Sequence, residues 1–171
     1  MVDIAALANQ AWPLKFKRHN FRAYYYNTLT CSIIYNRYQF SLHEHQPSPS
    51  PPPGDYRAGW SANHIIGTRF PGPIRAQWTA LDGSEHRAEI DLEALFADRL
   101  VLHNLTRNDF TDDWLAAKSI NPVPADILME LNDRTISIFS QALLVTKDDI
   151  RPDEHPSRLR EDLIPVWTHT Y

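Results

Sequence analysis

Two histidines separated by one residue, His43 and His45, form the simplest metal-binding pattern in this sequence. Residues i and i+2 of an extended strand point to the same face, so both imidazoles would present nitrogen ligands to one ion. A third ligand would come from another histidine, with His64, His86 and His103 available. The corresponding hypothesis is a metal-dependent hydrolase, and the competing interpretation is a solvated strand end beside a proline-rich loop.

The single cysteine, Cys31, is the candidate thiol nucleophile, and one of eight histidines would have to serve as its base. It stands between Thr30 and Ser32 in a segment that we expect to be a strand, where a buried, unreactive thiol is the usual state. A lone cysteine forms no internal disulfide, so it does not identify a compartment.

Catalytic motifs with a defined spacing are absent from the sequence. There is no glycine-rich phosphate loop, no nucleophile elbow and no H-E-x-x-H zinc motif. Three aspartates at 109, 112 and 113 lie too close together, without a glycine turn, to form a calcium loop. We therefore predict no catalytic residue, no metal site and no cofactor, and a binding protein rather than an enzyme.

Aromatic residues beside acidic ones give the best indication of a site, because aromatic anchors surrounded by polar groups are typical of protein interfaces. Two segments have this composition, one after the proline-rich loop and one around a predicted helix. The predicted partner-binding residues are Tyr56, Trp60, Asp109, Phe110, Asp112, Asp113 and Trp114. Two alternatives stay open: tryptophans that only plug the ends of a β-sandwich, and a module of the cell envelope that binds carbohydrate through the same aromatics.

The overall composition limits the class of protein. The 171 residues carry a net charge of −4, which argues against a nucleic-acid-binding protein. No run of about 18 apolar residues is present, and residues 1–14 lack a basic segment followed by an apolar one, so the chain as written reads as cytoplasmic. Thirteen prolines and five glycines indicate stiff, ordered loops and favour a sandwich or barrel.

The segment 73–92 is the strongest structural signal, since apolar and charged residues alternate on both sides of an Asp-Gly step. A three-residue loop, 81–83, pairs Ile74 with Ile90 and Arg75 with Glu89, whereas a two-residue loop would pair core positions with charges. The same register puts Trp78 opposite His86, which we expect at the rim of the sheet.

A second hairpin spans 126–146. We predict a two-residue turn at Asn132 and Asp133, which sets Met129 opposite Ile136. Its second strand, 134–146, is apolar on both faces near its end and should be an inner strand. The sequence as a whole thus predicts an all-β fold, mainly an antiparallel β-sandwich, with one or two short helices.

The remaining segments are assigned from composition. We expect strands at 15–27, 31–43, 99–105 and 163–171, the second with Ile34, Tyr38, Phe40 and Leu42 facing inward, and a short strand within 56–68. Short helices are predicted at 93–98 and at 112–118, the latter capped by Thr111. We expect residues 1–171 to form one domain, with a proline-rich surface loop at 46–54 and a charged excursion at 147–162.

The C-terminal third resembles a family of bacterial proteins. The resemblance lies in the run 132–136, the Thr146-Lys147 step, His155-Pro156-Ser157, Arg160 with Asp162-Leu163, and 168–171, with looser agreement at Pro73, Trp78 and Asp91-Leu92. These features are similar to immunity proteins encoded beside phospholipase effectors of type VI secretion systems.

This resemblance implies a β-sandwich protein that binds a lipase-like toxin and occludes its active site, protecting the bacterium that makes it. It also implies a periplasmic lipoprotein, although the chain shows no lipidation cysteine near its start. A stoichiometric inhibitor needs a rigid scaffold with ordered loops, so we expect the 46–60 or the 106–118 loop to enter or cap the cleft of the effector.

Overall fold

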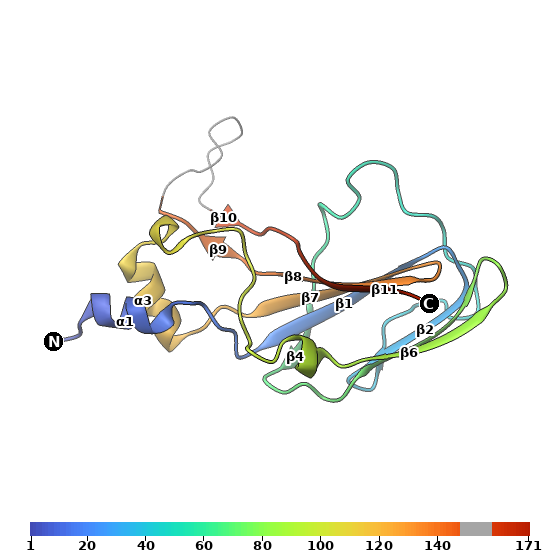
Figure 1. The fold of residues 1–171 in the computed structure, drawn as a ribbon, viewed down its shortest axis with the longest axis horizontal. Coiled ribbons are helices and arrows are strands. Elements are labelled where there is room, and N and C mark those ends of the chain that lie inside the picture. Colours follow the sequence, from blue (N-terminus) through green and yellow to red (C-terminus); the bar gives the residue numbers. More distant parts are fainter. Residues whose placement is uncertain (148–158) are drawn as a thin grey trace.

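The computed structural model describes residues 1–147 and 159–171 and contains two main sheets (Figure 1). The five-stranded sheet has the order β11-β8-β7-β1-β4, with β1 (His19–Tyr26), β4 (His64–Gly67), β7 (Ala125–Asn132), β8 (Thr135–Gln141) and β11 (Ile164–Thr170). The four-stranded sheet has the order β3-β2-β5-β6, with β2 (Thr28–Tyr35), β3 (Tyr38–Gln39), β5 (Ile74–Ala80) and β6 (Glu85–Ile90).

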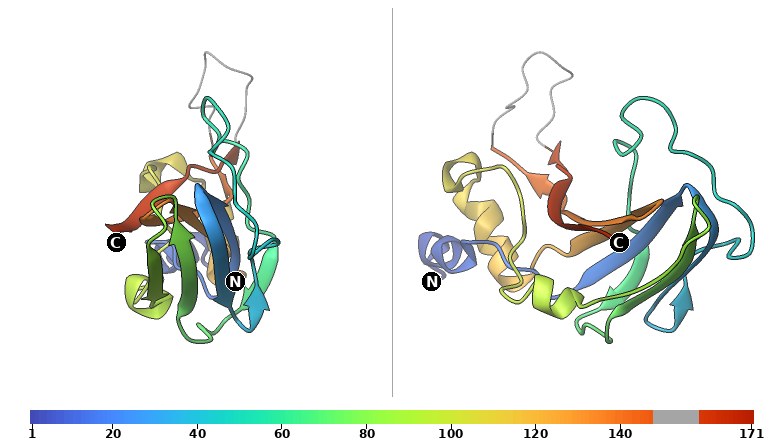
Figure 2. Two further views of the ribbon diagram at one scale, coloured as in Figure 1. Left: turned by 90° about the vertical axis from the view of Figure 1, so that its right-hand side faces the viewer. Right: turned by 45° about the vertical axis from the view of Figure 1, so that its right-hand side comes forward.

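The smaller elements lie between and beside these sheets. A two-stranded sheet pairs β9 (Leu144–Val145) with β10 (Leu159–Arg160). The helices are α1 (Ile4–Ala11), α2 (Leu92–Leu95) and α3 (Asp112–Ile120), with a 3-10 turn η1 (Arg107–Asp109). In Figure 2, α1 and α3 lie together at one end of the molecule, away from the long strands. The prediction of a mainly antiparallel β fold is confirmed, with three short helices where we expected one or two.

The two sheets share one core. Phe21 and Ile127 of the five-stranded sheet and Ile33 and Trp78 of the four-stranded sheet belong to a single cluster of buried side chains. Strand β1 passes into β2 through Asn27, whose φ of 55° lets the chain leave one sheet and enter the other. One pairing was not foreseen: β1 runs parallel to β7 along its whole length.

The hairpin formed by β5 and β6 has the predicted register. Ile74 lies opposite Ile90 and Arg75 opposite Glu89. The loop has three residues, since Ala80 and Ser84 close it with a backbone hydrogen bond of 2.9 Å, and Gly83 has a φ of 83°. Only glycine adopts this conformation without strain, which explains the Asp-Gly signal.

The rim position that we predicted for Trp78 is wrong. Its side chain is 1% exposed and lies in the core, and its Nε1–H donates to the Asp133 carbonyl oxygen at 2.7 Å. The polar edge of the indole is satisfied by the turn of the other hairpin, so the ring is fully enclosed without leaving an unpaired donor.

The hairpin formed by β7 and β8 has a register different from the predicted one. Asn132 pairs with Thr135, so the loop is Asp133-Arg134, and Met129 lies opposite Ile138 rather than Ile136. Asp133 adopts a φ of 54°, a conformation that aspartate tolerates better than most residues. A shift of two residues keeps every side chain on its predicted face, which is why apolar pairing alone did not detect it.

The predicted strand 31–43 is much shorter in the structure. β2 ends at Tyr35, because Asn36 and Arg37 have φ values of 53° and 60° and turn the chain into β3. The inward residues of β2 are Cys31, Ile33 and Tyr35. The predicted inward set is wrong, with Ile34, Tyr38 and Leu42 exposed and Phe40 only partly buried.

Three other segments, 99–105, the start of α3 and β11, were also assigned from the sequence. The expected strand at 99–105 is wrong: the described structure there has only an isolated bridge between Lys15 and Leu100. Thr111 caps α3 as predicted, accepting a hydrogen bond from the Trp114 amide at 3.1 Å. β11 forms an edge of the five-stranded sheet, with a register shift at Pro165.

The two predicted excursions are described to different extents. Residues 46–54 belong to no helix or strand, are mostly exposed, and stand away from the sheets in Figure 2. Of the predicted excursion 147–162, residues 148–158 lie outside the described part of the chain, and 159–160 form β10. None of the helices in the described ranges is both long and apolar enough to cross a membrane.

Candidate functional site

The seven predicted partner-binding residues lie in two separate places. Tyr56 and Trp60 pack over the outer face of the five-stranded sheet, the face turned away from the core. The other five, from Asp109 to Trp114, lie with η1 and α3 at the helical end (Figure 1). The structure therefore does not combine them into one site.

Trp60 is an internal residue. Its ring stacks on Tyr24 with centroids 4.3 Å apart and planes 4° apart, and it contacts Phe139 edge-on at 5.8 Å. Only 7% of Trp60 is exposed, so the expectation that it projects from the surface is wrong. A sugar ring would need a free aromatic face, and Trp60 has none to offer, which argues against its use in a carbohydrate site.

The residues around Trp60 hold the segment 55–62 on the sheet. The side chain of Glu130, on β7, is 5% exposed and pairs with Arg57 at 2.6 Å. It also accepts a hydrogen bond of 2.7 Å from the Tyr56 hydroxyl, and burial followed by this bond raises the pKa of Tyr56 to about 12. Arg57 in turn lies over the rings of Tyr56 and Phe139, at 4.9 and 5.2 Å.

We name this arrangement of Tyr56, Arg57, Trp60 and Glu130 the sheet latch. Our sequence reasoning missed Arg57 and Glu130. The available signal was Glu130 itself, an acid within the apolar run 127–131 of β7, because a buried carboxylate requires a paired cation or several donors.

The aromatic residues at the helical end are also largely internal. Phe110 is 2% exposed, contrary to the expectation of an exposed anchor. It stacks on Trp114 at 5.1 Å and contacts Trp12 at 5.8 Å. Trp114 is partly buried, and the Lys118 amine lies over its ring at 5.4 Å. This cluster packs α3 against the chain that follows α1.

The three aspartates of this region have different local roles. Asp109 accepts hydrogen bonds from the Thr106 amide at 2.8 Å and hydroxyl at 3.1 Å, closing a capping box. Asp112 pairs with Arg107 at 2.5 Å. Asp113 is exposed in the first turn of α3, where the helix dipole favours a negative charge. A capping box accounts for Asp109 and an ion pair accounts for Asp112, whereas the exposed Asp113 contributes its charge to the start of the helix.

The metal-site candidates His43 and His45 lie in a turn, not on a strand face. Both are exposed, and His45 contacts Glu44 at 3.2 Å. Within residues 1–147 and 159–171, no three histidine, cysteine, aspartate or glutamate side chains converge as metal ligands.

Burial in the core also shifts the pKa values of Cys31 and His19. Cys31 is 1% exposed, and burial raises the pKa of its thiol to about 12, so it is not a thiolate nucleophile near neutral pH. His19 is fully buried between the Gly67 carbonyl at 3.0 Å and the Tyr35 hydroxyl at 2.9 Å. Burial, the largest cause, lowers the pKa of His19 to about 4.

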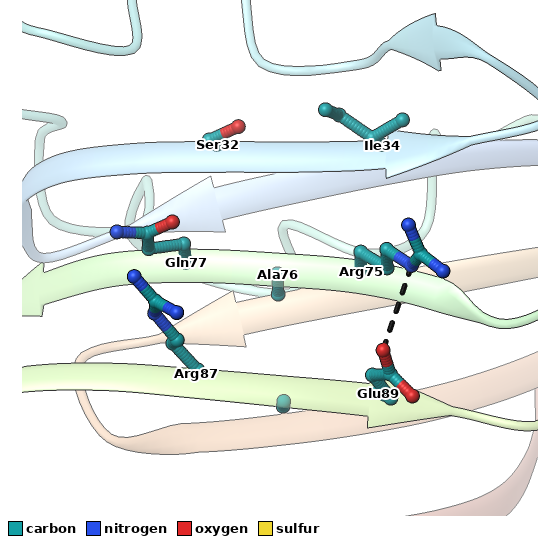
Figure 3. Close-up of a pocket in the computed structure, with 8 residues that line it drawn as sticks. Ser32, Ile34, Arg75, Ala76, Gln77, Arg87 and Glu89 are labelled. Carbon is teal, nitrogen blue, oxygen red and sulfur yellow. Dashed lines mark ion pairs between the residues drawn. The ribbon is translucent and has the colours of Figure 1, made fainter.

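The outer face of the four-stranded sheet carries an open hollow of about 380 Å³ (Figure 3). Arg75 and Glu89 form an ion pair of 3.5 Å across it, and both side chains are more than half exposed. Figure 3 shows Arg87 and Gln77 beside this pair, with Ser32 and Ile34 on the neighbouring strand. The hollow can bind polar groups, but its lining contains no nucleophile paired with a base.

Comparisons with known proteins add no assignment: no family model, no curated protein and no solved structure matches this chain.

Proposed function

We propose that this chain is an immunity protein that binds and inhibits a lipase-like effector of a type VI secretion system by occluding its active site. The proposal joins the resemblance of the C-terminal third to the presence of an ordered loop on a rigid scaffold. On the resemblance, the complex belongs to the periplasm.

The observation that carries the proposal is the anchoring of the proline-rich loop, residues 46–54. The Asn27 amide donates to the Pro49 carbonyl at 3.0 Å, and the Ser48 amide donates to the Thr28 carbonyl at 2.8 Å. The sheet latch fixes the chain directly after the loop. Residues 52–54, between these anchors, are exposed. A loop held in this way loses little conformational entropy when a partner immobilises it.

The proposal is tested with the product of the neighbouring gene, which the resemblance implies is a lipase-like effector. The two proteins are co-purified, their dissociation constant is measured by calorimetry, and hydrolysis of phospholipid vesicles is followed with increasing amounts of this chain. We expect saturable binding and loss of hydrolysis. A neighbouring lipase that is neither bound nor inhibited would contradict the proposal.

The role of the loop is tested by loosening it. Replacing Pro52 and Pro53 by glycine should weaken effector binding about tenfold, because each change adds conformational freedom worth about 0.4–1 kcal/mol. The exposed Pro71, which lies outside the loop, supplies the matched control Pro71→Gly. Equal affinities of the wild-type chain, the double glycine variant and Pro71→Gly would exclude the loop from the interface.

A further inference from the structure

Strand β1 has an open half-edge. β7 pairs with all of β1, from His19 to Tyr26, whereas β4 pairs on the other side only with residues 19–21. Upstream of His64 the chain leaves β1, and Trp60 stacks on Tyr24 over the outer face. The edge of β1 over residues 22–26 therefore has no neighbouring strand within the described parts of the chain.

The direction of the backbone groups along β1 follows from two hydrogen bonds. The carbonyl of Arg18 accepts from the Ala125 amide at 3.1 Å, and that of Tyr26 accepts from the Asp133 amide at 3.0 Å, so even-numbered residues point toward β7. Alternation then directs the N–H and C=O groups of Ala23 and Tyr25 to the open edge. No backbone or side-chain group of the described residues pairs with them.

A groove of about 290 Å³ runs along this edge. One wall is aromatic: Phe40 contacts Phe21 at 4.8 Å and Tyr38 at 4.8 Å, and His64 contacts Tyr38 at 4.3 Å. The other side carries Arg22, whose guanidinium lies over Tyr24 at 4.6 Å. The lining contains no acidic residue, and none of the carboxylates in the described ranges forms an ion pair with Arg22.

Two outer strands, β6 and β11, carry features that discourage strand pairing. β6 presents alternating charges at its edge, including Arg87 and Glu89. β11 contains Pro165 and a register shift beside it. Charges, prolines and bulges are the usual protections of an exposed edge. The half-edge of β1 has an alanine and a tyrosine at the positions whose backbone groups face outward, with no proline or bulge there, so it accepts a strand more readily than β6 or β11.

We propose that the open half-edge of β1 binds an extended segment of the partner protein, which adds a strand in line with β4. Only a polypeptide backbone supplies donors and acceptors at the spacing that Ala23 and Tyr25 require. The segment should carry an apolar side chain toward the aromatic wall and an acidic side chain toward Arg22. In naming the effector as the source of this segment, the inference rests on the proposed function.

Hydrogen exchange at single-amide resolution tests the added strand in the wild-type chain, using the toxin domain of the neighbouring effector as the probe. The amides of Ala23 and Tyr25 should exchange at least about tenfold more slowly in the complex, since each gains a hydrogen bond. Those of Arg22 and Tyr24, already paired with β7, should change little. A complex that leaves Ala23 and Tyr25 unprotected would overturn this inference and leave the proposed function standing.

A proline substitution gives a second test. Ala23→Pro removes an N–H that has no partner in the free protein and should weaken effector binding about tenfold or more. The matched control is Arg87→Pro, since alternation from the bond between Ala80 and Ser84 directs the Arg87 N–H to the outer edge of β6. Equal loss in both variants would contradict a specific role for β1, and the exchange experiment decides if Ala23→Pro does not fold.

Failure of the effector to bind would contradict the proposed function, and the edge would then be tested with a display library of random twelve-residue peptides. Selected peptides that combine acidic and apolar residues and protect the Ala23 and Tyr25 amides would support strand addition. A selection that yields no peptide protecting these amides would overturn it.

Discussion

The outer faces of the two sheets differ in what covers them. On the five-stranded sheet, the segment 55–62 buries Leu128 and Phe139 under Trp60, forming a second apolar cluster. On the four-stranded sheet, the corresponding face carries the exposed ion pair of Arg75 and Glu89. One sheet thus lies between two apolar layers, and the other has one apolar face and one solvated face.

This difference explains the patterns of the strands. β7 reads as a nearly continuous apolar run because both of its faces are covered, whereas β5 alternates because only one face is. It also shows why the carboxylate of Glu130 requires Arg57 and the Tyr56 hydroxyl as partners, while that of Glu89 does not require such partners. Burying a charge costs free energy only where a covering segment removes it from water. The pattern of apolar residues in a strand therefore depends on whether a segment distant in sequence covers its outer face.

Removing the indole of the cover is expected to have the largest effect. Trp60→Ala should lower the free energy of unfolding by about 3–5 kcal/mol, the usual cost of truncating a buried large aromatic side chain. Ile34→Ala, on the open face where the side chain is 40% exposed, should cost about 1 kcal/mol or less. Urea denaturation of both variants measures the difference, and equal losses would show that the segment 55–62 does not act as a cover.

The two sheets were predictable from the sequence to different degrees for the same reason. The hairpin at 73–92 alternates on one covered face, so a wrong register would put charges in the core, and its pairing was predicted correctly. In the hairpin of β7 and β8 the misplaced turn shifts the register by two residues, which leaves each side chain on its predicted face and so does not disturb the apolar pattern. The parallel pairing of β1 with β7 is a long-range contact that no local signal encodes.

The candidate site was harder to predict than the fold. A tryptophan near acids has the composition of an interface anchor, but the same residues can stack on a distant tyrosine, as Trp60 does on Tyr24. A single sequence does not show whether the tryptophan becomes an exposed anchor or a buried ring, because this depends on how the segment 55–62 crosses the sheet. Glu130, within the apolar run 127–131 of β7, was the local sign of a cover.

The loss of stability at acid pH tests a residue of the shared core rather than a residue of either outer face. His19 lies between the sheets, bonded to Gly67 on β4 and Tyr35 on β2. Its pKa falls from 6.5 to about 4 on folding, so the unfolded chain binds a proton that the folded chain does not. Stability is present above pH 6.5 and is lost as the pH falls toward 4, by about 2–3 kcal/mol.

The measurement compares urea denaturation of the wild-type chain and His19→Gln at pH 7.5 and pH 4.5. The variant should be less stable at neutral pH, because it lacks the buried ring, and its stability should fall less on acidification. A variant with the full acid dependence of the wild-type protein would assign that dependence to carboxylates elsewhere.

Breaking one ion pair on each outer face sharpens the comparison. Glu130→Ala leaves the Tyr56 hydroxyl and Arg57 without their carboxylate and should lower the free energy of unfolding by about 1–3 kcal/mol. This cost is moderate because the guanidinium of Arg57 can become hydrated. Glu89→Ala removes an exposed pair and should change stability by less than about 0.5 kcal/mol. Chemical denaturation at low and high salt reports both, and a cost for Glu89→Ala equal to that for Glu130→Ala would contradict the distinction between covered and open faces.

The smallest expected effects have opposite signs on the two sheets. Burial raises the pKa of Asp126 on β7 despite its hydrogen bond from Asn20, so the ionised group destabilises the folded chain at neutral pH. Asp126→Asn should stabilise the protein by less than about 1 kcal/mol at pH 7. This gain should disappear at acid pH, where the carboxyl is already protonated.

Asp82, in the loop between β5 and β6, is the exposed counterpart of Asp126. Hydrogen bonds from Ser84 lower its pKa, so its ionised form stabilises the folded chain above the unfolded pKa, and this stabilisation is lost as the pH falls through the folded pKa. Asp82→Asn should therefore lower the melting temperature slightly at neutral pH, while Asp126→Asn raises it. Removing the Asp126 charge should also lower the pKa of Glu161, which burial and then Asp126 raise, and NMR titration can detect this change. Shifts of the same sign in both melting temperatures would mean that burial does not govern the charges of the covered face.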